Sequence, residues 1–162
     1  MTPFFNNTTR IATLQAVCES WKHTPFMPNA AIKGAGVSCQ KLVGAIYVEC
    51  GALPPDFAVP EGPMNWSRAQ KESLIETFMD QQSAFVAVGF AEPGDMLGIK
   101  IGGCVHHCGV VFRANGRFVH CLRPDGVRFN NLHDATYWTR IEKIWRPIIA
   151  GDACSVEPVA RR

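Results

Sequence analysis

The residues best suited to chemistry in this chain are one cysteine at the start of a predicted helix and the histidines of the second half. Cys39 occupies the first turn of that helix, where the positive end of the helix dipole favours the thiolate, the nucleophilic form of cysteine. His106, His107 and His120 lie in later β-prone segments. A thiol, a distant histidine as its base and a third polar group that orients the imidazole form the arrangement of a thiol hydrolase.

The helix that carries Cys39 is marked at both ends. Ser38 is the predicted N-cap, because its hydroxyl oxygen can accept a free backbone N–H, and Gly51 ends the helix before Pro54. Apolar residues recur at helical spacing along it, as they do over an earlier segment, 10–21, which Thr8 or Thr9 can cap. The two helices are expected to pack together and bury Leu14, Val17, Leu42, Val43 and Ile46.

The chain changes character near residue 84. A third helix, starting at Asn65 or Ser67, is expected before that point. After it, β-prone segments are separated by turn signals, of which Asn115-Gly116 is the strongest. These segments are 85–88, 96–101, 107–113, 117–122, 127–129 and 141–149. Because helices come first and antiparallel strands second, the predicted fold class is α+β rather than alternating α/β.

Composition and charge set the broad class of the protein. The 162 residues are 47% apolar and 19% charged, which is typical of one globular domain spanning 1–162. The core is expected over about 10–148, with a frayed tail over 150–162. A net charge of +2 with scattered basic residues argues against nucleic acid or an anionic membrane as a partner.

Targeting signals also bear on the location of the chain. No apolar stretch approaches the ~18 residues of a membrane span, and the first ten residues lack the pattern of a secretory signal. The expectation is a chain that is cytoplasmic at synthesis and does not insert into a membrane. Seven cysteines are an odd number, and without an export signal reduced thiols are expected, with Cys18 and Cys50 as packing residues.

A metal site is the competing interpretation of the second half. Zinc takes cysteine and histidine ligands in tetrahedral sets, and six such residues crowd into residues 104–121. However, Cys104 and Cys108 have no second cysteine pair at matching spacing. Small hydrophobic packing is the preferred interpretation of these cysteines, and no metal or cofactor is expected. The candidate ligands are Cys104, His106, His107, Cys108, His120 and Cys121.

Five segments carry a resemblance to a known family. They are Thr24-Pro25-Phe26 with Lys33-Gly34-x-Gly36-Val37-Ser38-Cys39 and Leu42-Val43; Pro93-Gly94-Asp95-Met96-Leu97; His107-x-Gly109-Val110-Val111; Asn115-Gly116-Arg117-Phe118-Val119-His120; and Tyr137-Trp138. In order and spacing they resemble the NlpC-type (papain-like) cell-wall cysteine peptidases, and most closely the bacteriophage branch. The agreement runs from about residue 10 to residue 148.

The resemblance implies a fold, a site and a reaction. It implies a papain-like fold, with N-terminal helices carrying the cysteine packed on a C-terminal antiparallel sheet. Cys39 would be the nucleophile, His107 the general base and His120 the orienting group. The implied reaction is hydrolysis of an amide bond in peptidoglycan stem peptides through a Cys thioester. The implied route to the substrate is a virion tail or a prophage lysis system, with phage tail proteins as partners.

Two residues beside the nucleophile depart from the family pattern. Ser38 stands where the family usually has Asp, and Gln40 where it usually has a small residue or Ser. Because both flank the nucleophile, they bear on substrate choice and on activity itself. Ser38, Gln40 and Phe26 are the predicted substrate-binding residues.

Simple hairpin geometry does not bring the two family histidines together. A two-residue turn at Asn115-Gly116 would place His120 opposite Val111, on the face of His107 but about 13 Å along the strand at ~3.3 Å per residue. Direct contact requires a different turn, a bulge or strong twist. His106 is expected to point to the other face of the strand and to take no part.

Three functions are consistent with the sequence. The first is a thiol hydrolase of the cell-wall peptidase type. The second is a catalytically silent relative that binds a partner such as a phage tail component. The third is a thiol acyltransferase or deacylase on the same fold. Fold does not choose among them, because one fold supports many functions.

Overall fold

Two helices in the first third of the chain form one layer of the structure. The computed structural model describes residues 1–62 and 72–149. The first helix, α1 (Thr8–Ser20), begins after Asn7, whose side-chain oxygen accepts the Arg10 backbone N–H at 2.9 Å. The expected cap at Thr8 or Thr9 is therefore wrong, because both threonines are already helical and Asn7 supplies the capping oxygen.

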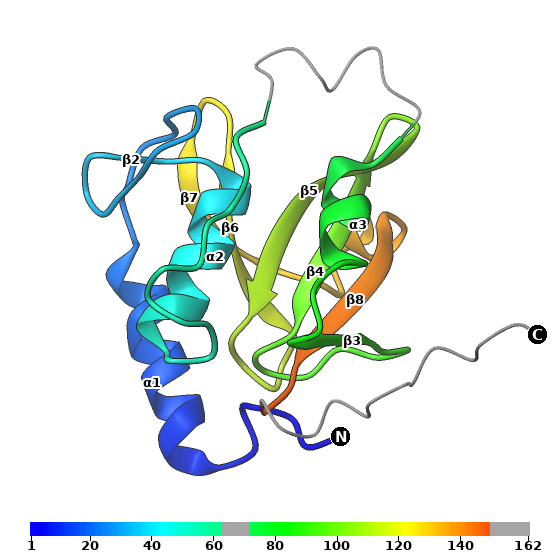
Figure 1. Cartoon of the computed structure of the whole chain (residues 1–162). Coiled ribbons are helices and arrows are strands. Elements are labelled where there is room, and N and C mark those ends of the chain that lie inside the picture. The colour runs from blue at the N-terminus through cyan, green and yellow to red at the C-terminus, as the bar shows by residue number, and fades with distance from the viewer. Residues whose placement is uncertain (63–71, 150–162) are drawn as a thin grey trace, which may run out of the picture.

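The second helix, α2 (Cys39–Glu49), lies between α1 and the sheet (Figure 1). Four of the five residues expected in the core are buried, and Val17 is half-buried against the same cluster. Past the end of α2, Gly51 has a φ of 74°, in the left-handed region that glycine adopts without strain. The predicted bounds and packing of this helix are therefore confirmed.

The second half of the chain forms a six-stranded antiparallel sheet in the order β3-β8-β4-β5-β6-β7. The strands are β3 (Phe85–Ala87), β4 (Met96–Ile101), β5 (Cys104–Val111), β6 (Arg117–Leu122), β7 (Gly126–Asn131) and β8 (Ile141–Pro147). The predicted bounds of β4 and β6 are confirmed. β5 begins three residues before its predicted start, and β7 runs two residues past its predicted end.

The last strand of the sequence is an internal strand of the sheet. β8 pairs with β3 on one side and with β4 on the other. The start of the chain lies beside the end of β8, because the Phe4 N–H donates to the Pro147 carbonyl at 2.8 Å and Pro3 forms a bridge with Ile148. Residues from both ends of the described chain therefore meet at one edge of the fold.

Both faces of the sheet are buried. The larger apolar cluster lies between the sheet and the two helices, and β5 supplies Val105, Cys108 and Val110 to it. A smaller cluster on the opposite face is built around Phe118 and Leu132. Tyr137 packs against this second cluster from α4 (Ala135–Trp138), a four-residue helix that the sequence did not predict.

A short third helix lies against β5. α3 (Leu74–Met79) begins after Ser73, whose hydroxyl accepts the Glu76 N–H and donates to the Val105 carbonyl at 2.6 Å. This hydroxyl therefore caps α3 and fixes it to β5. The predicted start of this helix at Asn65 or Ser67 lies outside the described residues, as does the predicted frayed tail.

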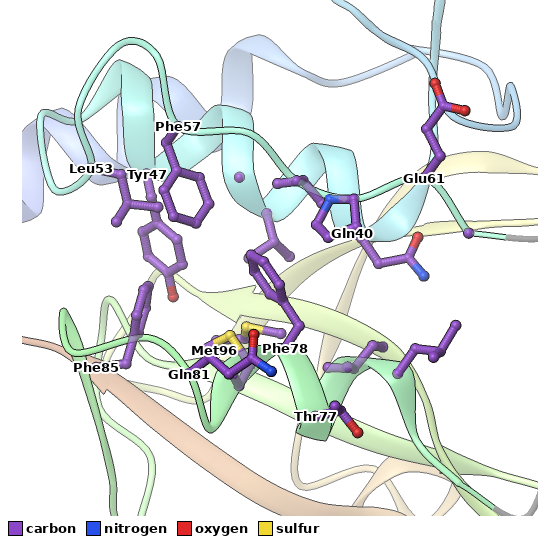
Figure 2. A pocket seen from close by; sticks show the side chains of 18 residues that line it. Gln40, Tyr47, Leu53, Phe57, Glu61, Thr77, Phe78, Gln81, Phe85 and Met96 are labelled. Carbon is purple, nitrogen blue, oxygen red and sulfur yellow. The ribbon is translucent and has the colours of Figure 1, made fainter.

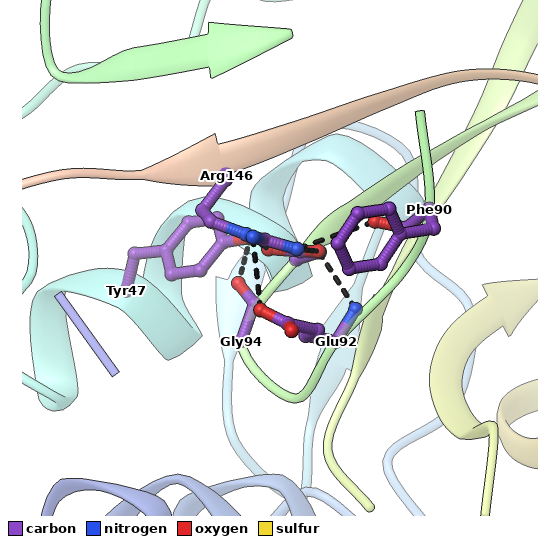
Figure 3. Close-up of polar contacts among 6 residues, drawn as sticks. Tyr47, Phe90, Glu92, Gly94 and Arg146 are labelled. Atoms are coloured by element: carbon purple, nitrogen blue, oxygen red, sulfur yellow. Dashed lines mark hydrogen bonds and ion pairs between the residues drawn. The ribbon is translucent and has the colours of Figure 1, made fainter. Parts of the chain in front are cut away.

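A buried ion pair and a tyrosine hydroxyl hold the turn at Gly94 and Asp95 against β8 and α2 (Figure 3). The Arg146 guanidinium of β8 binds both carboxylate oxygens of Asp95, at 2.9 and 2.8 Å. Arg146 also pairs with Glu92 at 2.9 Å. The Tyr47 hydroxyl of α2 donates to the Gly94 carbonyl at 2.9 Å. The Pro-Gly-Asp turn found in the sequence is thus held by a strand and by the helix that carries Cys39.

Candidate active site

Cys39 is the first residue of α2 and follows a short hairpin of β1 (Ala31–Ile32) and β2 (Gly36–Val37). Its side chain is partly exposed. The Val37 N–H donates to the Pro25 carbonyl, and the Met27 N–H donates to the Val37 carbonyl. The segment around Phe26 is therefore hydrogen-bonded to the strand that leads into Cys39.

Ser38 occupies the N-cap position but does not cap the helix with its side chain. Its hydroxyl makes no cap hydrogen bond, and the oxygen is buried without a partner in the described structure. The residue is 6% exposed, so its backbone rather than its hydroxyl shapes the start of α2. The capping expectation was wrong, and a substrate-binding role for Ser38 stays a prediction.

The hairpin between β5 and β6 has a longer loop than the sequence indicated. Gly109 pairs with His120, and Val111 pairs with Phe118, which leaves residues 112–116 in the loop. The two-residue turn expected at Asn115-Gly116 was therefore wrong, and the register shifts by two residues. His120 lies opposite Gly109, only two positions from His107, instead of opposite Val111.

Gly109 allows the two histidine rings to approach. A Cβ at this position would meet the Val119 carbonyl oxygen at 2.7 Å and the His120 Cβ at 3.1 Å. Because glycine lacks this atom, the ring of His107 and that of His120 come together across it. Their centroids are 5.0 Å apart. The space beside Gly109 is thus filled by the Val119 backbone and by His120.

Three polar side chains form a hydrogen-bonded row along one face of β5, β6 and β7. His107 Nε2 lies 2.8 Å from His120 Nδ1, and His120 Nε2 lies 2.9 Å from Asn130 Oδ1. With Nε2 of His107 engaged in this row, Nδ1 is the ring nitrogen left for Cys39. The row joins a candidate base to an orienting group, and Asn130 extends it by one residue.

His120 is enclosed by aromatic rings and is fully buried. Phe118 and Tyr137 have centroids 4.7 and 5.3 Å from its ring. Burial, followed by the repulsion of a charge on His107, lowers the pKa of His120 to about 3, against a smaller opposing effect of Asn130. His120 is therefore a neutral imidazole at pH 7 and carries one N–H.

The start of α2 lies against the end of the β5–β6 ladder. The ladder covers only three residue pairs and ends at Gly109 and His120. Cys108 and Cys121 follow directly beyond its end, one on each strand. The Cys121 thiol donates to the Val37 carbonyl at 3.1 Å, which places the start of α2 against this point.

The pKa of Cys39 lies well below its ordinary value. The largest cause is a hydrogen bond from the Cys108 thiol. A hydrogen bond to His107 and the positive charge of that residue lower the pKa further, while burial of Cys39 acts to raise it. The Cys108 backbone N–H also stabilises the sulfur. The lowered pKa agrees with the sequence expectation, but its first cause is a thiol that the sequence assigned to packing.

Other cysteines of the fold have raised pKa values. Burial raises the pKa of Cys18 well above its ordinary value and that of Cys50 and Cys121 to about 12. Cys108 also has a raised pKa, chiefly because its thiol donates to Cys39. These thiols stay protonated at neutral pH, so Cys39 is chemically distinct from them.

His106 does not join the row. The β4–β5 register skips it, since Ile99 pairs with His107 and Lys100 with Val105, which makes His106 the extra residue of a β-bulge. Its Nε2 lies 3.2 Å from the Cys104 sulfur. Within residues 1–62 and 72–149, no three cysteine, histidine or carboxylate side chains are placed to hold a metal ion.

Gln40 borders a cavity of about 300 Å³ that runs along α2 (Figure 2). One end lies at Gln40 and Glu61, and the other lies at Tyr47, Leu53 and Phe85. Most of its lining side chains are apolar. Gln40, which lines the cavity, follows the candidate nucleophile directly in the sequence.

Comparison with known proteins gives the fold. A staphylococcal structure, described as similar to a lipoprotein of the NLP/P60 family from Staphylococcus aureus Mu50, superposes with a TM-score of 0.61 at 17% identity over 92% of this chain. The NlpC/p60 domain of the peptidoglycan hydrolase SagA gives 0.54 at 14% identity over 83% of this chain and 96% of its own. The chain has the NlpC/P60 fold.

A third structure with the NlpC/P60 fold, from Bacillus cereus ATCC 10987, gives a TM-score of 0.59 at 19% identity over 86% of this chain. The match covers 44% of the staphylococcal protein and 40% of the Bacillus protein. No protein-family model and no curated protein sequence matches the chain. Across residues 1–62 and 72–149, no helix is long and apolar enough to span a membrane.

Two residues of this candidate site were missed from the sequence. The strand was predicted to end at Phe129, so Asn130 lay outside it. Side chains alternate between the two faces of a strand, and Asn130, two residues after Arg128, therefore shares the face of His120. Cys108 was assigned to packing because a cysteine among apolar neighbours is usually inert. No local signal distinguishes Cys108, since its partner Cys39 lies in a distant part of the chain.

Proposed function

We propose that this protein is a cysteine peptidase or amidase that hydrolyses an amide bond in peptidoglycan stem peptides through a Cys39 thioester. The observation that carries the proposal is the low pKa of Cys39 beside the row of His107, His120 and Asn130. The NlpC/P60 fold supports it, and one structural neighbour is described as a peptidoglycan hydrolase.

The first half of the reaction uses the thiolate and the protonated base. The Cys39 sulfur attacks the amide carbonyl carbon, and a C–S bond forms as the carbonyl oxygen takes negative charge. Backbone N–H groups at the start of α2 have no intrahelical acceptor and suit this oxyanion. His107 then gives its proton to the leaving nitrogen, the C–N bond breaks, and the amine departs from the thioester.

The second half restores the enzyme. His107, now neutral, takes a proton from water, and the resulting oxygen nucleophile attacks the thioester carbonyl. The C–S bond breaks, the carboxylic acid leaves, and the proton on His107 again pairs with the Cys39 thiolate. His120 orients the imidazole throughout and stays neutral.

Substrate recognition is assigned to the residues around the nucleophile. Gln40 is partly exposed and carries an amide that can bind a peptide group. Phe26 is partly exposed and lies beside Val37 through a parallel bridge. Ser38 is buried at the N-cap directly before Cys39, and we assign it a part in shaping the substrate site. These roles are part of the proposal, as is delivery of the chain to the wall by a phage or prophage system.

The proposal is tested with purified muropeptides. We expect the protein to add water across one amide bond, detected by mass spectrometry, and Cys39→Ala to abolish the reaction. Cys50→Ala is the matched control, because Cys50 follows the opposite end of the same helix and its pKa is raised. Hydrolysis that survives in Cys39→Ala would contradict the proposed nucleophile.

A folded protein whose Cys39 is reactive, but which cleaves no muropeptide, would instead support a binding relative or a different substrate. The cavity beside Gln40 favours one such alternative, a deacylase or acyltransferase, because an apolar acyl chain fits an apolar cavity. Hydrolysis of p-nitrophenyl octanoate that exceeds hydrolysis of the acetate, and that depends on Cys39, would support this second function.

A further inference from the structure

Asn130 ends the row of polar side chains and contacts neither Cys39 nor His107 in the described hydrogen-bond network. Its Oδ1 atom lies 2.9 Å from His120 Nε2. The residue lies on β7, where it pairs with Phe118 of β6, so the backbone of two strands fixes its position. It therefore acts on the site only through His120.

The identity of the Asn130 atom that faces His120 decides where His120 carries its proton. A carbonyl oxygen only accepts hydrogen bonds, so Nε2 of His120 must be the N–H donor. Because His120 is neutral, its Nδ1 then carries a lone pair and accepts. The 2.8 Å contact consequently runs from the Nε2–H of His107 to Nδ1 of His120.

The reversed arrangement would prevent the base from working. If the amide nitrogen faced His120, Nε2 would accept and Nδ1 would carry the proton. His107 Nε2 would then have to be the acceptor and stay deprotonated. An imidazolium carries N–H groups at both nitrogens, so a proton taken from Cys39 would bring two N–H groups into opposition across the 2.8 Å contact.

We propose that Asn130 is a positioning residue that holds His120 in its Nε2–H form, so that His107 can take and return the Cys39 proton at Nδ1. The inference rests on the proposed function for its effect on turnover, but the proton position itself is independent of any substrate. The enclosing rings of Phe118 and Tyr137 leave His120 few alternative partners, and Asn130 is the acceptor that selects the form.

The proton position is measured directly by NMR. In protein labelled with ¹⁵N-histidine, long-range proton–nitrogen correlations report which ring nitrogen carries hydrogen. At pH 7 we expect His120 to carry it at Nε2 in the wild type. In Asn130→Leu we expect the Nδ1–H form to gain population, because the acceptor is gone. A wild-type His120 protonated at Nδ1 would overturn the proposal.

Two further variants separate positioning from structure. Asn130→Asp keeps an acceptor oxygen and should retain the Nε2–H form and most of the activity. Asn131→Leu is the matched control, because in the described structure the Asn131 side chain bonds only the His133 N–H and the Asn115 carbonyl, and it lies on the other face of β7. It should leave the His120 signals unchanged.

The kinetic expectation follows from the loss of an oriented base. Asn130→Leu should lower kcat by about 10²-fold or more, the smaller end of what a positioned acid–base group contributes, with little change in KM. Unchanged kcat and unchanged signals in a folded Asn130→Leu would overturn the proposal. If the wild type shows the predicted proton position but cleaves no muropeptide, the proposed function fails and the positioning role stands. If Asn130→Leu does not fold, the wild type and Asn130→Asp still decide the proton position.

Discussion

The largest cause of the lowered pKa of Cys39 is a second thiol rather than a histidine. The sequence indicated the helix dipole and His107, while the structure adds the Cys108 S–H as the largest cause of the lowered pKa. A neutral donor stabilises a thiolate without needing a charge of its own, so it acts whether or not His107 is protonated.

We expect Cys108→Ala to raise the pKa of Cys39 and slow its alkylation by iodoacetamide at pH 6. At that pH an ordinary thiol of pKa ~8.5 is almost wholly protonated, so the rate reports the thiolate fraction. Cys108→Ser keeps an O–H donor and should label faster than Cys108→Ala. Peptide mapping by mass spectrometry gives the rate at each cysteine, with Cys18 and Cys50 as unreactive references. Equal labelling in Cys108→Ala and wild type would remove Cys108 from this role.

Because His120 is buried with a lowered pKa, the free energy of unfolding is expected to depend on pH. Its pKa is about 3 in the folded protein and near 6.5 when unfolded, so the unfolded chain binds more protons between these values. Stability should therefore fall as the pH drops below 6.5, by as much as about 1.4 kcal/mol per pH unit from this one group. Urea denaturation at pH 7, 5 and 4 measures the effect.

The variant His120→Asn isolates this contribution, because asparagine does not titrate. Its unfolding free energy should fall less steeply than that of the wild type from pH 6 to pH 4. Parallel curves for the two proteins, or a His120 ring that titrates near pH 6 in NMR spectra, would show that the buried ring is charged in the fold.

The site was predictable from the sequence to the extent that it rests on local signals. Cys39 was found because Gly51 and the apolar spacing define its helix, and His107 because Gly109 follows it in a known motif. Asn130 was not found, because two asparagines at the end of a strand look like a turn. Its role depends on a partner two positions along the neighbouring strand, which no local pattern reveals.

At the scale of elements, turn chemistry misled the prediction more than strand propensity did. Asn115-Gly116 is a strong two-residue turn signal, yet the loop takes five residues, 112–116, and Gly116 adopts a φ of 84° within it. The Gly116 N–H donates to the Arg113 carbonyl inside this loop. The register shifts by two residues as a result, which leaves each side chain on its predicted face. The shift brings His120 beside His107, as the family resemblance implied and the two-residue turn did not allow.

The contact between α1 and α2 predicts the cost of truncating a core residue. Ile46 is fully buried in the main cluster, so Ile46→Ala should lower the free energy of unfolding by about 2–5 kcal/mol through lost burial and a cavity. Ile32→Ala is the matched control, because Ile32 is 62% exposed and its loss should change stability by less than about 0.5 kcal/mol. Similar urea midpoints for both variants would contradict the assigned core.

At the scale of the whole molecule, the Arg146–Asp95 pair connects parts that the sequence could not relate. Burial raises the pKa of Asp95, although Arg146 opposes this. Arg146→Met leaves a buried carboxylate without its cation, and we expect a loss of about 3–5 kcal/mol at pH 7. The loss should shrink toward pH 4.5, because protonated Asp95 needs no cation.

Thermal and urea denaturation of two variants test this account. The double variant Asp95→Asn with Arg146→Met removes both charges and should recover much of the stability lost in Arg146→Met alone. If Arg146→Met is as stable as the wild type at pH 7, the Arg146–Asp95 pair does not stabilise the fold.

The internal position of β8 has a consequence for the timing of synthesis. Cys39, His107, His120 and Asn130 all leave the ribosome before β8 does. A nascent chain that stops near residue 140 lacks β8, which lies between β3 and β4 in the sheet. In such a chain β3 has no strand to pair with, and Asp95 has no Arg146 to bind. The sheet that carries the histidines is complete only once residue 147 has left the ribosome. Until then Cys39 belongs to an incompletely folded chain. The environment that lowers the pKa of Cys39 is therefore expected only in molecules whose translation has passed β8.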